Sequence, residues 1–276
     1  MSATSGLGGP LRVGVMLAAL LAVVLVALLA VGLLWVYKRQ EQLLFQPEVL
    51  PASHRFEFGA DVVELRIPVD GAVLSALQLR VPNPKGLVFY LHGNAGSLQS
   101  WFVNADFYRR AGYELVMLDY RGYGKSSGRI ESEAQMRADV RAAWGAVAPR
   151  YAGLRCVIVG RSLGTSLAAG LAIEVKPEYV VLISPYTRMA DLMRQHFPLL
   201  PTALLRYPLD TAALLPAWRG PLLLIHGEQD TLIPPQHSER LLALRPQGRL
   251  AVIRGAGHKD LQGFEQYLQV LREVLP

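Results

Sequence analysis

The chain has 276 residues, of which 28 are Lys or Arg and 22 are Asp or Glu, giving a formal net charge of +6. These charges are spread without a basic run, which argues against a nucleic-acid-binding arm or face. The hydrophobic content of 51% excludes a disordered chain. The single cysteine, Cys156, excludes an internal disulfide framework and a zinc site built from cysteines.

The first predicted element is a membrane-spanning helix over residues 13–37, which follows a short tail at residues 1–12. The 25 residues of this run carry no charge and include eight Leu and seven Val. At about 1.5 Å per residue they reach roughly 37 Å, enough to cross the hydrocarbon core of a bilayer. A cleaved signal peptide has a shorter apolar core of about 7–15 residues. We therefore expect an uncleaved anchor, with residues 38–59 as a linker to the soluble part.

The side of the membrane on which the soluble part lies depends on few charges. Lys38, Arg39 and Arg55 follow the span, whereas Arg12 and the α-amine precede it. Positively charged flanks tend to stay in the cytoplasm, so this count favours a cytoplasmic soluble domain. The opposite orientation, with Arg12 inside, stays open because the two counts are similar.

From residue 62 onward, strand-like apolar runs alternate with amphipathic helical runs. The first two strands are joined by Asp70-Gly71, a turn that is typical of an antiparallel hairpin. The later strands are continuous apolar runs, as expected of a parallel sheet covered on both faces. The predicted strands are 62–69, 73–80, 87–91, 114–118, 156–159, 180–183, 222–225 and 249–253, and the predicted helices are 99–110, 133–148, 163–175, 237–244 and 260–274. This alternation predicts an α/β fold with a mostly parallel eight-stranded sheet, in which functional loops gather at the carboxyl ends of the strands.

The clearest functional motif is Gly160-Arg161-Ser162-Leu163-Gly164, between a predicted buried strand and a predicted helix. A G-x-S-x-G run in this position is typical of a sharp strand-to-helix turn, since only small residues fit on either side of the serine. The turn lifts the serine hydroxyl out of the sheet and places the amino end of the helix beneath it. That end and the Leu163 N–H can stabilise a developing oxyanion. The motif therefore predicts Ser162 as a nucleophile.

A serine nucleophile needs a base, and the base needs a third group that orients it. Asp230 and His258 each follow one of the last two predicted strands. The order serine, acid, histidine is the one that accompanies such a turn, so we expect both side chains to point toward Ser162. Glu228 is the rival acid, although its earlier place in the turn favours surface exposure. His226 is interpreted as a packing residue because Gly227 follows it directly.

A second backbone donor to the oxyanion is expected from the loop after the third predicted strand. This loop reads Leu91-His-Gly-Asn-Ala-Gly96, and its small residues allow the backbone to approach a scissile carbonyl closely. We assign the donor N–H to Asn94, with Ala95 as the alternative. His92 is interpreted as structural. Asp119 is interpreted as a turn-stabilising residue because it precedes the serine in the chain.

Together these motifs resemble the α/β-hydrolase superfamily across residues 60–276. The runs that carry the resemblance occur together and in order: Leu91-His-Gly-Asn94, Asp119-Tyr-Arg-Gly-Tyr-Gly-Lys-Ser-Ser-Gly128, Gly160-Arg-Ser-Leu-Gly164, His226-Gly-Glu-Gln-Asp230 and Gly257-His258. The chain looks like small membrane-anchored serine hydrolases of the lysophospholipase-like, monoacylglycerol-lipase-like or acyl-protein-thioesterase-like kind. The resemblance implies a catalytic domain at 60–276 with a triad of Ser162, His258 and Asp230. No metal, cofactor or nucleic-acid partner is implied.

The substrate class depends on a short cap expected at residues 187–220, where members of this superfamily insert one. Its many apolar residues fit either ordinary packing onto the sheet or a small lid over an acyl-binding cleft. Because a bilayer anchor favours lipid-like substrates, the sequence predicts a membrane-anchored serine hydrolase of the carboxylesterase, lysophospholipase or thioesterase type, acting through an acyl-enzyme. A serine peptidase or amidase on the same triad and a non-catalytic membrane-tethered binding module stay open as alternatives. The sequence does not encode the oligomeric state.

Overall fold

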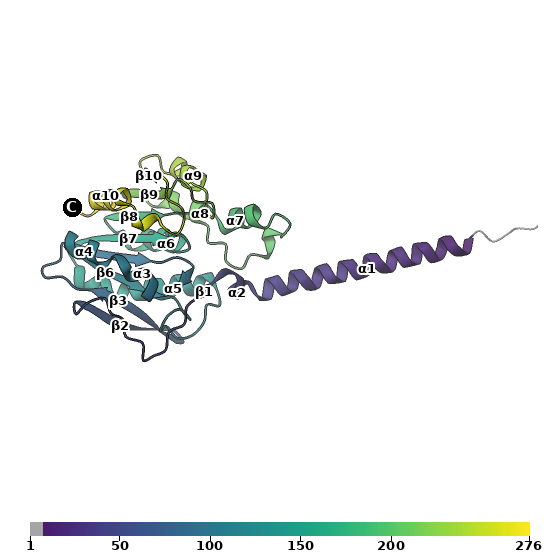
Figure 1. Ribbon diagram of the computed structural model, residues 1–276, viewed down its shortest axis with the longest axis horizontal. Coiled ribbons are helices and arrows are strands. Elements are labelled where there is room, and N and C mark those ends of the chain that lie inside the picture. The colour runs from purple at the N-terminus through teal and green to yellow at the C-terminus, as the bar shows by residue number, and fades with distance from the viewer. Residues whose placement is uncertain (1–7) are drawn as a thin grey trace, which may run out of the picture. The chain divides into compact units, whose positions relative to one another are not determined.

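The computed structural model describes residues 8–276, and contacts among residues divide the chain after Gln40 into two units. The first unit holds one continuous helix, α1 (Gly8–Lys38), which is labelled in Figure 1. Within the 27 residues of α1 from Arg12 to Lys38, an 18-residue window has a mean hydropathy of 3.1, so by length and composition this helix is able to cross a membrane. A signal sequence would meet the same two criteria.

The second unit, residues 41–276, is built on an eight-stranded sheet. Its strands in chain order are β2 (Val62–Val69), β3 (Ala72–Leu79), β4 (Gly86–Leu91), β6 (Tyr113–Leu118), β7 (Arg155–Arg161), β8 (Tyr179–Ile183), β9 (Leu222–Gly227) and β10 (Arg249–Ile253). They lie in the order β10-β9-β8-β7-β4-β6-β3-β2. The β2–β3 and β3–β6 pairs are antiparallel and the other pairs are parallel. The prediction of a mostly parallel eight-stranded sheet is confirmed.

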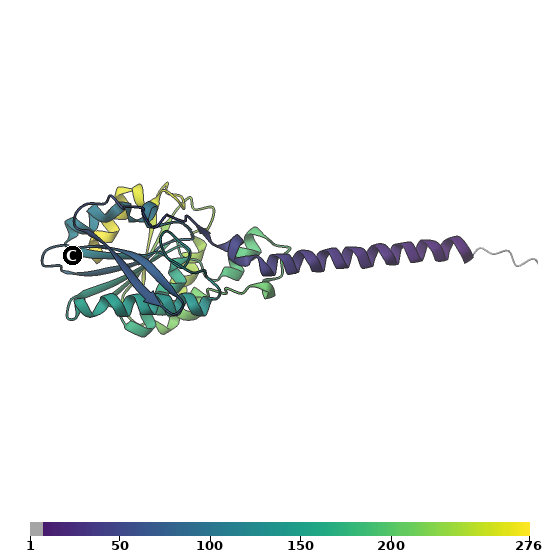
Figure 2. The ribbon, with the colours of Figure 1, turned by 90° about the horizontal axis from the view of Figure 1, so that it is seen from below.

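Helices cover both faces of this sheet because its central strands are apolar on both sides (Figure 2). Successive side chains of a strand point to opposite faces. In β4, Phe89 packs into one core and Val88 into the other. The first core also receives residues of α5 (Glu133–Val147), α6 (Gly164–Val175) and α9 (Gln236–Leu244), and the second receives residues of α4 (Ala105–Ala111) and α10 (Glu265–Val274).

The continuous helix predicted at 99–110 is wrong, because the structure breaks it into three pieces. These are α3 (Leu98–Trp101), a 3₁₀ turn (Phe102–Asn104) and α4. Phe102 is fully buried in the second core, whereas Val103 beside it is 53% exposed. The sequence has no helix breaker at this place. The helix therefore breaks where Phe102 packs into the tertiary core, and no local sequence pattern indicates that packing.

Residues 41–59, which the sequence assigns to a linker, lie within the second unit. The segment contains α2 (Gln40–Leu44) and β1 (Gln46–Pro47), and β1 pairs in parallel with β5 (Ala95–Gly96). Phe45 between them is only 5% exposed and meets the Tyr207 ring edge-on at 5.1 Å. Backbone hydrogen bonds to a loop some fifty residues away thus order a segment that has no periodic apolar pattern of its own. The compact unit that contains the sheet therefore begins at Glu41.

The cap at residues 187–220 follows β8 and is fixed mainly at its base. It contains α7 (Met189–His196), a 3₁₀ turn (Thr202–Leu204) and α8 (Thr211–Leu214). Every residue of α7 is at least partly exposed, whereas Tyr207 and Leu209 are fully buried in the first core. The base of the cap therefore belongs to the folded core, and α7 with the loop after it projects from the domain (Figure 1).

Candidate active site

The turn between β7 and α6 holds Ser162 in a left-handed backbone conformation with φ of +50°. This conformation is uncommon outside glycine, and surrounding contacts must enforce it. A Cβ on Gly160 would lie 2.5 Å from the Gly164 carbonyl oxygen, and one on Gly164 would lie 2.2 Å from the Leu91 carbonyl oxygen. Both positions are therefore restricted to glycine by direct approach of backbone to backbone. The Ser162 N–H donates to the Ile183 carbonyl at 2.9 Å, which ties the turn to β8.

Asp230 and His258 lie side by side beyond the carboxyl ends of β9 and β10. His258 Nδ1 donates to Asp230 Oδ2 at 2.7 Å. The other oxygen of Asp230 accepts the Leu232 N–H at 3.1 Å and the Ile233 N–H at 2.8 Å. The carboxylate is thus held by its own loop on one side and by the histidine on the other. Because Nδ1 carries the proton shared with Asp230, Nε2 of His258 is the nitrogen left to act as a base.

The electrostatics of Asp230 keep it ionised. Burial by itself would raise the pKa of this carboxyl group. The nearby His226 imidazole and the hydrogen bond from His258 outweigh that effect, and the Ile233 N–H adds to them, so the pKa lies well below its usual range. Asp230 is therefore suited to orient and stabilise a histidine cation without taking its proton.

The rival acids and histidines occupy other places. Glu228 is exposed, and its carboxylate accepts the Gly255 N–H at 3.0 Å. His226 is fully buried, donates to the Ile233 carbonyl at 2.6 Å and contacts Ser238 Oγ at 2.6 Å. It contacts the Asp230 loop from the buried side, with its Nε2 3.4 Å from Asp230 Oδ2.

His92 and Asp119 form a second histidine–aspartate pair that has no access to solvent. Both side chains are fully buried, with His92 Nε2 3.5 Å from Asp119 Oδ1. His92 Nδ1 donates to the Gly93 carbonyl at 2.7 Å, and Asp119 accepts the Leu98 N–H at 3.0 Å. Burial raises the pKa of Asp119. The pair therefore fixes the loop after β4 from the inside.

The loop after β4 passes directly over the serine. A Cβ on Gly93 would lie 3.5 Å from Ser162 Cβ. The Asn94 carbonyl accepts Tyr123 Oη at 2.6 Å and the Gln46 N–H at 3.4 Å, which sets the orientation of this stretch of backbone. Leu163, the other expected donor, is 3% exposed at the first turn of α6. The assignment of the Asn94 and Leu163 N–H groups to an oxyanion hole remains a proposal.

Arg161, the residue before the serine, contacts the histidine loop, which sequence reasoning missed. It is only 2% exposed, and its guanidinium donates to the His258 carbonyl at 2.8 Å and to the side-chain oxygen of Gln262. The same guanidinium lies 5.1 Å from the centre of the Trp101 ring. Arg161 thus joins the nucleophile turn to the histidine loop. No local signal marks it, because the second position of G-x-S-x-G accepts many residues.

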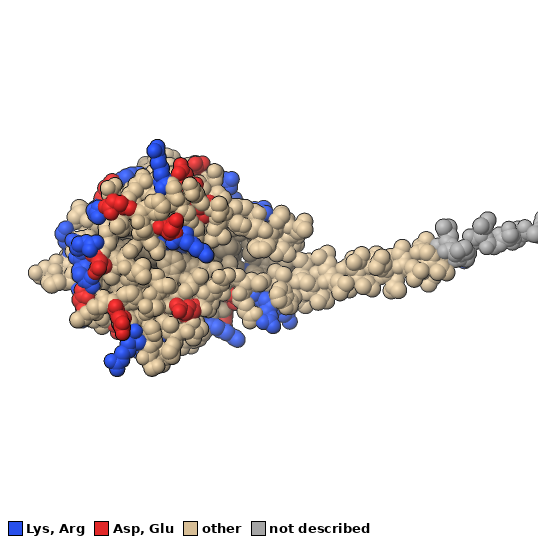
Figure 3. Space-filling model, in the orientation of Figure 1, with Lys and Arg blue, Asp and Glu red and all other residues tan. Residues whose placement is uncertain are grey.

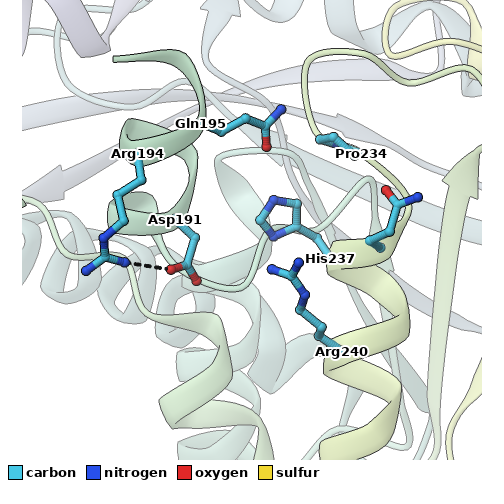
Figure 4. A pocket seen from close by; sticks show the side chains of 7 residues that line it. Asp191, Arg194, Gln195, Pro234, His237 and Arg240 are labelled. Carbon is cyan, nitrogen blue, oxygen red and sulfur yellow. Dashed lines mark hydrogen bonds and ion pairs between the residues drawn. The ribbon is translucent and has the colours of Figure 1, made fainter. Parts of the chain in front are cut away.

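A hollow of about 530 Å³, lined mainly by polar and charged residues, lies between α7 and the start of α9 (Figure 4). His237 on its wall is 4% exposed and accepts the Thr187 N–H on Nδ1 at 3.2 Å. Burial, reinforced by the charge of Arg240, lowers the pKa of His237 and keeps it neutral. Asp191 on the opposite wall accepts the Thr187 hydroxyl at 2.6 Å and Arg194 at 3.0 Å. These contacts tie the cap to the helix that follows the Asp230 loop.

Comparison with known proteins identifies relatives across most of the chain. The family model described as "Serine aminopeptidase, S33" matches residues 82–212. A Mycobacterium tuberculosis protein of uncharacterised function, Rv2307c, is 34% identical over 257 residues, which is 88% of this chain and 89% of that one. The human alpha/beta hydrolase domain-containing protein 17B is 34% identical over 202 residues, which is 70% of this chain and 67% of that one.

Solved structures with lower identity share the fold. An esterase from Pyrococcus furiosus superposes with a TM-score of 0.66 at 22% identity, covering 84% of this chain and 97% of that one. An alpha-beta serine hydrolase homologue from Coxiella burnetii superposes with a TM-score of 0.61 at 19% identity, covering 81% of this chain and 98% of that one. At these identities the likeness is one of architecture.

Proposed function

The chain belongs to the α/β-hydrolase superfamily and is a hydrolase, and we propose that it is a membrane-anchored serine hydrolase that cleaves carboxylic ester or thioester bonds of acyl substrates. The observation that carries the proposal is the 2.7 Å contact between His258 Nδ1 and Asp230. Arg161 donates to the carbonyl of the same histidine, so the histidine loop lies against the turn that presents Ser162. The proposed nucleophile, base and orienting carboxylate thus belong to three loops at the carboxyl ends of the strands, which supports this assignment.

The proposed reaction uses these groups in two steps. Ser162 Oγ attacks the acyl carbonyl while His258 Nε2 accepts its proton, and the N–H groups of Asn94 and Leu163 hold the oxyanion. The protonated histidine then gives that proton to the leaving alcohol or thiol, which departs from the acyl-enzyme. A water molecule, deprotonated by His258, then attacks the acyl-enzyme, the acyl group leaves as a carboxylic acid, and the histidine returns the proton to Ser162 Oγ. Asp230 stays ionised throughout, consistent with its lowered pKa.

The acyl substrate class is supported by the apolar cap and by the helix that precedes the domain. The cap stretch at 197–205 contains Phe197, five further apolar side chains of Leu and Ala, and two prolines, with one Thr. A membrane anchor formed by α1 would hold this stretch near lipid. We expect the anchor to resist extraction by carbonate, and a cysteine replacing exposed Gln46 to be shielded from an impermeant maleimide in intact cells if the domain is cytoplasmic.

The description of the matching family model favours a second candidate, an aminopeptidase. Such an enzyme must bind the amine of its substrate, and a free carboxylate near the nucleophile is the usual partner for an ammonium group. The cap offers Asp191 and Asp210. Asp191 already accepts Thr187, Arg188 and Arg194, and Asp210 accepts the Ala213 N–H at 2.8 Å as the cap of α8. Both carboxylates are engaged, so the ester or thioester activity is the better proposal. A non-catalytic binding module would have no use for the ionised Asp230 beside His258.

The test is turnover of a homologous series of p-nitrophenyl esters, from acetyl to octanoyl, beside the corresponding thioesters and amino-acid amides. Each CH₂ buried in an acyl site contributes about 0.8 kcal/mol, so kcat/KM should hold or rise as the chain lengthens. Activity confined to acetyl esters would contradict an acyl-chain site. Faster cleavage of amino-acid amides would favour the aminopeptidase.

A further inference from the structure

The tip of the cap is an apolar surface that the folded domain leaves uncovered. Leu199 is 95% exposed and Phe197 is 61% exposed, and Leu232 in the Asp230 loop is 49% exposed. The eleven residues from 195 to 205 contain no Lys, Arg, Asp or Glu, and Figure 3 shows the projecting end of the cap without charged side chains on that face. Exposed large apolar side chains that cluster in this way mark a surface for a partner or a lipid.

This apolar surface continues into the loop that carries the catalytic acid. His196, the last residue of α7, donates through Nε2 to the Leu232 carbonyl at 2.8 Å. The Leu232 N–H in turn donates to Asp230 Oδ1 at 3.1 Å. Phe197 follows His196 directly and Leu199 comes two residues later, so this hydrogen bond joins the cap tip to the Asp230 loop. We call the exposed side chains of Phe197, Leu199 and Leu232 the cap-tip patch.

The other end of the cap is bound to the segment where the domain begins. Glu41 pairs with Arg206 at 2.6 Å and accepts the Tyr207 hydroxyl at 2.7 Å. Phe45 packs edge-on against the same tyrosine. Phe197 and Leu199 therefore belong to a cap whose later segment, at Arg206 and Tyr207, is fixed to residues 41–45 of the same domain.

Chain connectivity places residues 41–45 near the end of the apolar helix. Only Arg39 and Gln40 separate Lys38, the last residue of α1, from Glu41. Three residue steps span at most about 11 Å, whatever the orientation of the two units. Trp35, Tyr37 and Lys38 are side chains that favour the boundary between hydrocarbon and water. If α1 spans a bilayer, Glu41 and the cap base fixed to it must lie at the membrane surface.

From these contacts we propose that the cap-tip patch contacts the lipid bilayer, with Phe197 and Leu199 in the interface. The inference rests on the membrane anchor of the proposed function and adds a second point of attachment. Two attachments would set the face of the domain that meets the membrane, whereas α1 alone leaves the domain free to rotate about its short connection. The Asp230 side of the active site would then face lipid, and an acyl chain would reach it without crossing water.

The test places an environment-sensitive fluorophore at two leucines of the full-length chain in phosphatidylcholine–phosphatidylglycerol vesicles. Leu199→Cys is the probe site and Leu244→Cys is the matched control, since Leu244 is 42% exposed at the other end of α9, which leads away from the active-site edge. Both are made in a Cys156→Ser background, and Cys156 is outside the candidate site. We expect lipids with a nitroxide in the upper acyl chain to quench the probe at 199 strongly and the probe at 244 hardly at all.

The outcomes distinguish the proposal for the cap-tip patch from the proposal for the membrane anchor. Vesicle flotation with quenching at 199 supports the proposal, and flotation with no quenching at 199 overturns it while the anchor stands. A blue-shifted probe at 199 without lipid quenching would mean that protein, such as a second copy of the chain, covers the patch, and would also overturn it. Failure to float overturns the patch and the anchor together, while fluorophosphonate labelling of Ser162 reports the hydrolase separately.

A second experiment measures the activity of a double variant that combines Phe197→Asp and Leu199→Asp. We expect this double variant to lose several-fold more activity on esters embedded in vesicles than on a water-soluble short-chain ester, because charged side chains are excluded from the interface. An equal loss on both substrates would place the two residues in the acyl site itself and overturn the proposed lipid contact.

Discussion

The nucleophile turn and the cap leave the same edge of the sheet, yet packing constrains them very differently. Residues 160–164 are all buried, and two of them tolerate no added atom. The cap is secured at Tyr207 and Leu209, while α7 has no buried residue and Leu199 is almost fully exposed. The comparison shows that the groups proposed for chemistry are positioned by contacts that admit one geometry. The segment proposed to meet lipid and substrate is fixed only at its base.

The largest effect is expected from Ser162→Ala, which removes the proposed nucleophile from the constrained turn. The loss in kcat should be on the order of 10⁶, with only binding and oxyanion effects left. The measurement is ester turnover together with labelling by a fluorophosphonate probe. Ser184→Ala is the matched control, since Ser184 is also buried with a positive φ at the end of the neighbouring strand. Full labelling of the Ser162→Ala protein would refute the assignment.

Asp230→Asn should lower kcat by roughly 10⁴, because the amide favours the wrong imidazole tautomer of His258. Glu228, the exposed rival acid, provides the comparison variant. Glu228→Gln should change turnover little, since its exposed side chain accepts only the Gly255 N–H, which the oxygen of the glutamine amide can still accept. Steady-state kinetics of the two variants, made side by side, decide between the carboxylates. A larger loss in Glu228→Gln would show that the wrong acid has been chosen.

Arg161→Gln tests whether the constrained turn also positions the histidine. Loss of the bond to the His258 carbonyl should misplace the imidazole and lower kcat by up to about 10²-fold, with KM little changed. Arg161→Lys should recover part of kcat, because an ammonium group can still donate to that carbonyl. If both variants lose only stability and keep the wild-type kcat, Arg161 has a purely structural role.

The smallest predicted change concerns stability and compares the two regions directly. Gly164→Ala places a methyl group against the Leu91 carbonyl and should lower the free energy of unfolding by about 1–3 kcal/mol or more. Leu199→Ala in the cap tip should change it by less than about 0.5 kcal/mol, because an exposed side chain loses little packing. Urea unfolding of both variants in detergent measures the difference. Equal destabilisation would contradict the contrast between turn and cap.

The sequence predicted best those features that repeat a local pattern. Strand-like apolar runs located every strand of the main sheet within a few residues, and the parallel strands were continuous runs because a strand buried on both faces must be apolar throughout. The turn at Ser162 was identified by the glycines on both sides of the serine. The motif itself shows that only small residues fit at these positions. The break at Phe102 was missed because burial of one side chain in a distant core leaves no periodic trace.

Sequence by itself determined the α/β architecture, the serine turn, and the candidate acid and histidine at successive strand ends, since each follows from spacing along one stretch of chain. Only the tertiary structure decided which carboxylate meets His258, that Arg161 joins the histidine loop to the serine turn, and that residues 41–45 bind the cap. The physical reason is that these contacts join segments tens to hundreds of residues apart. Their energies come from shape, burial and hydrogen-bond geometry that exist only once the sheet has assembled.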